Sequence, residues 1–82
     1  MKPGKQMDIN VRGTDMFGAS FGERAQLIDV ADRELCLSMW RPVGENTRVE
    51  VQFYENESYW MRGQIMKVRI QLDGTQIVKV KL

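Results

Sequence analysis

Residues 11–23 of the chain read VRGTDMFGASFGE, and this stretch decides the fold. Its three glycines alternate with an aspartate and two phenylalanines, a composition that disfavours a helix. The residues just before it, 7–12, alternate apolar and polar side chains, as a half-buried strand does. The stretch therefore predicts a first strand over residues 7–12, a loop over 13–22 and a second strand over 23–30.

The same alternation recurs along the rest of the chain, whereas helical periodicity is poor. It predicts further strands over residues 35–39, 49–53, 59–71 and 77–82. The apolar phase changes beside Gly63, which predicts a β-bulge near residues 63–66. Six short strands predict an all-β fold with little or no helix, in which an antiparallel barrel closes and removes exposed edges.

The dipeptide at residues 73–74 is Asp-Gly, which marks the turn of the last hairpin. An odd loop that pairs Ile70 with Val78 and Lys67 with Lys81 keeps the apolar residues on one face. We therefore expect that register. Flexible methionines are expected as fillers of the core, namely Met7, Met39, Met61 and Met66.

The chain has 82 residues, which predicts one domain over residues 1–82. Its net charge is +1, so no global excess indicates nucleic acid or an anionic membrane. A single cysteine and no histidine exclude an internal disulfide, a zinc site and His-based catalysis. No apolar run approaches the ~20 residues that span a bilayer. We expect a cytoplasmic protein that is not an enzyme and holds no metal.

Six positions of residues 11–23 match the segment V-x-G-x-D-x-x-G-x-x-F-x-E that leads into the second strand of PilZ domains, small bacterial β-barrels that often sense cyclic di-GMP. They are Val11, Gly13, Asp15, Gly18, Phe21 and Glu23. The chain resembles this family over nearly its whole length. The resemblance implies the barrel, a regulatory role and a ligand turn at residues 29–34.

The ligand features that the resemblance implies are mostly missing. Family members that bind cyclic di-GMP carry R-x-x-x-R before the first strand, but this chain has only Lys2 and Lys5 there. In the turn motif D/N-x-S-x-x-G, Ala31 replaces the serine and Glu34 replaces the glycine. Alanine offers no hydroxyl, and glutamate adds negative charge beside a dianion. We therefore expect no cofactor and weak or lost cyclic di-GMP binding.

The candidate ligand-binding residues that are left are Arg12, Asp29 and Arg33. Asp29 is either a remnant contact or a cap of its own turn. The two arginines either meet a phosphate or pair with surface acids, where such pairs contribute little.

A second candidate is a basic strip made of Lys67, Arg69, Lys79 and Lys81. Like charges opposite one another are mildly destabilising, which favours an acidic partner at this surface. The other interpretation is a solvated edge whose lysines discourage strand addition. Nearby aromatics either stack on single strands or plug the core, namely Trp40, Tyr54, Tyr59 and Trp60.

The sequence thus favours a non-enzymatic PilZ-like module that regulates or binds another protein, whose identity it does not indicate. Two alternatives stay open. One is a cyclic di-GMP-binding PilZ domain whose arginine pair lies upstream of this chain. The other is a small nucleic-acid-binding barrel, which the near-zero net charge disfavours. A homodimer is also left open.

Overall fold

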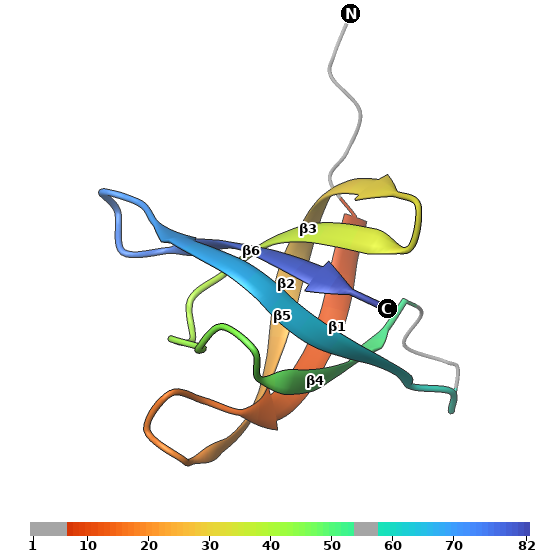
Figure 1. Ribbon diagram of the computed structural model, residues 1–82, viewed down its shortest axis with the longest axis horizontal. Coiled ribbons are helices and arrows are strands. Elements are labelled where there is room, and N and C mark those ends of the chain that lie inside the picture. Colours follow the sequence, from red (N-terminus) through yellow and green to blue (C-terminus); the bar gives the residue numbers. More distant parts are fainter. Residues whose placement is uncertain (1–6, 54–57) are drawn as a thin grey trace, which may run out of the picture.

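The computed structural model describes residues 7–53 and 58–82, which form a closed antiparallel barrel (Figure 1). Its strands are β1 (Met7–Thr14), β2 (Ser20–Ala31), β3 (Glu34–Met39), β4 (Arg48–Gln52), β5 (Met61–Ile70) and β6 (Gln76–Lys81). Around the barrel they follow the order β1-β2-β3-β6-β5-β4, and β4 pairs with β1 to close it. The described residues contain no helix. The predicted all-β, six-stranded barrel is therefore confirmed.

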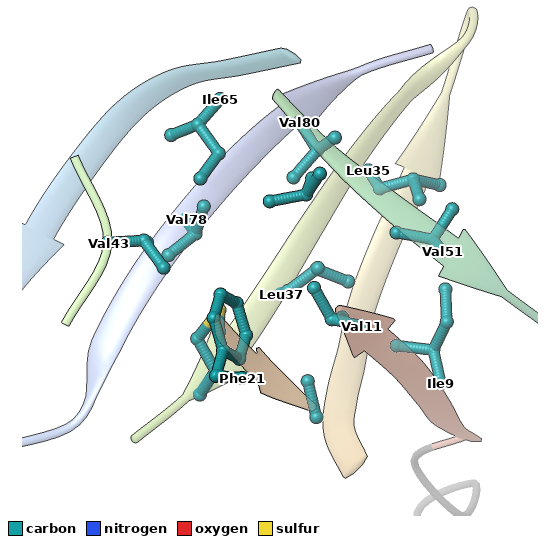
Figure 2. Packing of buried hydrophobic residues seen from close by; sticks show 13 residues of the cluster. Ile9, Val11, Phe21, Leu35, Leu37, Val43, Val51, Ile65, Val78 and Val80 are labelled. Atoms are coloured by element: carbon teal, nitrogen blue, oxygen red, sulfur yellow. The ribbon is translucent and has the colours of Figure 1, made fainter. Parts of the chain in front are cut away.

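Alternate residues of each strand line the barrel interior, where branched side chains from neighbouring strands pack together and the Phe21 ring lies at one end of the cluster (Figure 2). Met39 is buried there, and Met61 packs against the core. Met7 and Met66 are 42% and 43% exposed, so they are not core fillers as expected. Met66 lies in a bulge, which turns its side chain outward, and Met7 begins β1 at one end of the barrel.

The loop between β1 and β2 is shorter than expected, because both strands extend into residues 13–22 up to the pair Thr14–Ser20. Asp15 closes the turn: its Oδ1 accepts the backbone N–H groups of Phe17 and Ala19, both at 2.9 Å. The Asp15 N–H also donates to the Ala19 carbonyl at 2.8 Å. This aspartate therefore shapes the loop.

The predicted bulge is confirmed, since the pairing of β5 with β6 shifts between Ile65 and Lys67. The predicted register is wrong: Ile70 pairs with Gln76, and Lys67 pairs with Lys79. The reason is that Gln71 N–H donates to the Thr75 carbonyl at 2.8 Å, which centres the turn on residue 73 and not 74. Each residue of β5 between the bulge and the turn therefore pairs with a residue of β6 two positions earlier than predicted. The same residues still share a face of each strand, because the shift is an even number.

The loops β1–β2, β3–β4 and β5–β6 lie at one end of the barrel, because consecutive strands run in opposite directions. The β5–β6 hairpin projects beyond the barrel at this end (Figure 1), and Leu72 at its tip is fully exposed. Trp40 and Tyr59 are 64% and 67% exposed, so they are not core plugs. Tyr54 lies outside the described residues.

Candidate functional site

The three candidate ligand residues do not come together. Arg12 lies opposite Gly22 of β2, whereas Asp29 lies seven residues further along that strand, about 23 Å away at ~3.3 Å per residue. Arg12 Nε donates to Glu50 Oε1 at 2.8 Å, and its guanidinium lies 3.9 Å from the centre of the Trp60 ring. Arg12 is therefore engaged on the β1–β4 side of the barrel, away from the proposed ligand turn.

Asp29 and Arg33 do lie near each other, at the turn between β2 and β3. Asp29 Oδ1 accepts the N–H of Val30 at 2.9 Å, which is the local capping role. Arg33 has a positive φ of 68° and its carbonyl accepts the N–H of Leu82 at 2.8 Å. The backbone of this turn is thus used to hold the chain's last residue.

The hollow at this turn is poorly suited to a cyclic dinucleotide. Its volume is about 110 Å³, below the roughly 300–1,000 Å³ of small-molecule sites. Asp29 and Glu34 contribute two carboxylates to its lining, against the single ammonium of Lys79. Lys2 and Lys5, which stand where the family has its arginine pair, lie outside the described residues.

The basic strip is largely assembled by the β5–β6 hairpin. Lys67 and Lys79 face each other across the two strands, and they line a hollow of about 440 Å³ with Arg69 and Glu45. Lys81 lies apart from this hollow, between Gln64 of β5 and Glu34 of β3. The structure thus brings three of the four predicted residues together.

Two further arginines extend this surface, and sequence reasoning missed them. Arg62 of β5 lies opposite Glu50 of β4, which in turn lies opposite Arg12 of β1. Arg48 lines the same hollow of about 330 Å³ as these residues. Alternation placed Arg48 on an outer face, but nothing in the sequence showed that β4 pairs with β1.

Charge is consequently segregated around the barrel. The strands β4, β5 and β6 carry six lysines and arginines and one acid, whereas β1, β2 and β3 carry two and four. We call the six exposed cationic side chains the basic face: Arg48, Arg62, Lys67, Arg69, Lys79 and Lys81. No ion pair joins any of them to an acid of residues 7–53 or 58–82.

No family model, no curated protein and no solved structure matches the chain. The likeness to PilZ domains therefore rests on the motifs quoted above. In the part of the chain that the structure describes, no helix is long and apolar enough to cross a membrane. Within the same residues, no group of three or more acidic or cysteine side chains is placed to hold a metal ion.

Proposed function

We propose that the chain is a non-enzymatic, PilZ-like regulatory module that binds an acidic partner protein through the basic face and does not use cyclic di-GMP. The observation that carries this proposal is the segregation of charge onto β4, β5 and β6 in a chain whose net charge is only +1. Such a patch steers an oppositely charged partner and selects against basic ones.

The lining of the basic face favours a protein over a nucleic acid. The hollow between Lys67 and Lys79 is lined by the aliphatic side chains of Val68 and Ile77, with no aromatic residue. Single-stranded nucleic acid is usually held by bases stacked on aromatic rings beside the cationic groups. Trp60, which directly precedes β5, already stacks on Arg12.

A charge reversal tests the proposal with a matched control. Lys67→Glu changes the basic face, and Arg33→Glu makes the same change in net charge at the β2–β3 turn. We expect Lys67→Glu to reduce capture of an acidic protein from nuclease-treated native extract about fivefold, and Arg33→Glu to leave it unchanged. Equal loss in both variants, or capture that occurs only in a parallel extract not treated with nuclease, would contradict the proposal.

The cyclic di-GMP alternative has its own test. Asp29, Asp32 and Glu34 put three carboxylates within the β2–β3 segment, and these repel a dianion. We expect calorimetric titration of the chain with cyclic di-GMP to show no saturable heat. Saturation at low micromolar ligand would establish a nucleotide-binding PilZ domain instead.

A further inference from the structure

The strand β5 has an open edge in the half that projects beyond the barrel. Its pairing with β4 covers Met61–Gln64, and two hydrogen bonds with residues 46 and 47, of 2.7 and 2.8 Å, extend it to Ile65. Asn46 then turns the chain away with a φ of 68°. Among the described residues, β5 from Lys67 to Ile70 pairs only with β6.

The ladder with β6 determines which backbone groups point to this edge. Gln71 is hydrogen-bonded to Thr75, and bonded pairs alternate with unbonded ones in an antiparallel ladder. Lys67 and Arg69 therefore bond to β6, whereas Val68 and Ile70 direct their N–H and C=O groups outward. A single row of strand donors and acceptors thus points away from β6, and such a row is the template for strand addition.

A carboxylate already occupies one of these groups. Glu45 Oε2 accepts the N–H of Val68 at 3.3 Å, where the carbonyl of a neighbouring strand would otherwise lie. Glu45 also lines the hollow that contains Lys67, Arg69 and Lys79. The chain itself therefore shows that this edge accepts an acidic residue.

The side chains beside the edge define what an added strand needs. Lys67 and Arg69 lie on one face, and Val68 and Ile70 lie on the other, with Ile70 74% exposed. Cross-strand neighbours interact pairwise, so acidic residues suit the first face and apolar residues suit the second. The matching segment alternates acidic and apolar residues.

We propose that an extended acidic segment of a partner protein adds to β5 along Lys67–Ile70 and displaces Glu45 from the N–H of Val68. This inference rests on the proposed function and specifies how the partner docks. A second copy of the chain is not the occupant, because pairing two such edges would place the cations of Lys67 and Arg69 beside the same cations of the other copy. Like charges at that spacing are destabilising.

The test uses a synthetic blocked peptide of alternating glutamate and valine. Its control is the same peptide with alternate amides N-methylated, which keeps charge and composition but removes backbone donors. We expect the first peptide to slow amide exchange at Ile70 about tenfold or more, and the methylated peptide to bind at least about tenfold more weakly. Glu45→Ala should raise the affinity about threefold, because the edge is then vacant in every molecule.

Two results would overturn the inference while leaving the proposed function intact. One is equal binding of both peptides without protection of Ile70, which means contact through side chains alone. The other is no peptide binding at low salt by a chain that still captures its partner in a Lys67-dependent manner. Tighter binding of a single-stranded oligonucleotide than of the peptide would overturn both.

Discussion

Among the glycines that the structure describes, Gly63 has the least room for a side chain. A Cβ added there would lie 2.6 Å from Val80 Cγ1 and 3.3 Å from both Leu82 Cδ2 and the Lys81 carbonyl. We expect Gly63→Ala to reduce the free energy of unfolding by about 1–3 kcal/mol, as overpacking does. Urea denaturation measures this.

Gly22→Ala is the matched control for that substitution, because a Cβ there meets nothing within 4 Å. Its effect should stay within about 0.5 kcal/mol. Equal losses at both glycines would mean that the crowding at Gly63 is not the cause.

The lowered pKa values of two aspartates predict how the free energy of unfolding falls in acid. The hydrogen bond from the N–H of Ala19 is the main cause that lowers the pKa of Asp15. The hydrogen bond from the hydroxyl of Thr75 is the main cause that lowers the pKa of Asp73. Because both values lie below the ordinary value of about 3.9, their stabilisation is present above pH ~4 and lost as the pH falls below it. The variant with Asp15→Asn and Asp73→Asn should show a shallower fall between pH 5 and 2 in urea titrations. An unchanged slope would show that other carboxylates dominate.

Residue patterns predicted much at this scale and failed at identifiable points. Asp15 was identified only as a position of the family motif, and in the structure its Oδ1 accepts two backbone N–H groups that shape the loop. Met66 was expected in the core, and Trp40 either in the core or stacked on a single strand of nucleic acid. A bulge exposes Met66, and the end of β3 exposes Trp40. Hydrophobicity gives no information on where a strand ends relative to the barrel.

At the scale of elements, the alternation of apolar and polar residues predicted which segments are strands and which residues of each strand share a face. It did not predict which strands pair with each other. The β5–β6 turn centres on Asp73 because Thr75 bonds both the Asp73 carboxylate and Gln71, a local contact that the Asp-Gly signal did not distinguish from a later turn. The pairing of β1 with β4 joins segments about forty residues apart, for which the sequence carries no periodic signal. Arg48 and Arg62 join the basic face through the pairing of β4 with β5, which was not predicted either.

The hairpin β5–β6 keeps two lysines opposite each other, at a cost to its own stability. We expect Lys67→Glu to stabilise the barrel by about 0.2–1 kcal/mol, because it replaces repulsion from Lys79 with attraction. The gain should shrink in 1 M salt, where screening shortens the range of the interaction. Thermal denaturation of parent and variant at two salt concentrations measures this. A destabilised variant would show that Lys67 serves the fold and not a partner.

The whole molecule is nearly neutral, although its charges are unevenly distributed over the surface. The net charge of +1 indicated neither nucleic acid nor an anionic membrane, yet the closed barrel sets β4, β5 and β6 side by side and gathers their cations on one side. The order of the strands around the barrel, which the structure supplies, brings lysines and arginines that are scattered in the sequence onto one surface. The proposed partner surface is therefore a property of the assembled barrel.

Hydrogen–deuterium exchange on the complex with the captured partner tests the central claim most directly. Our account predicts protection on binding within β5 and β6, concentrated at Lys67–Ile70, and unchanged exchange at the β2–β3 turn. Protection at residues 29–34 with none on β5 would place the partner on the PilZ ligand side and contradict the account.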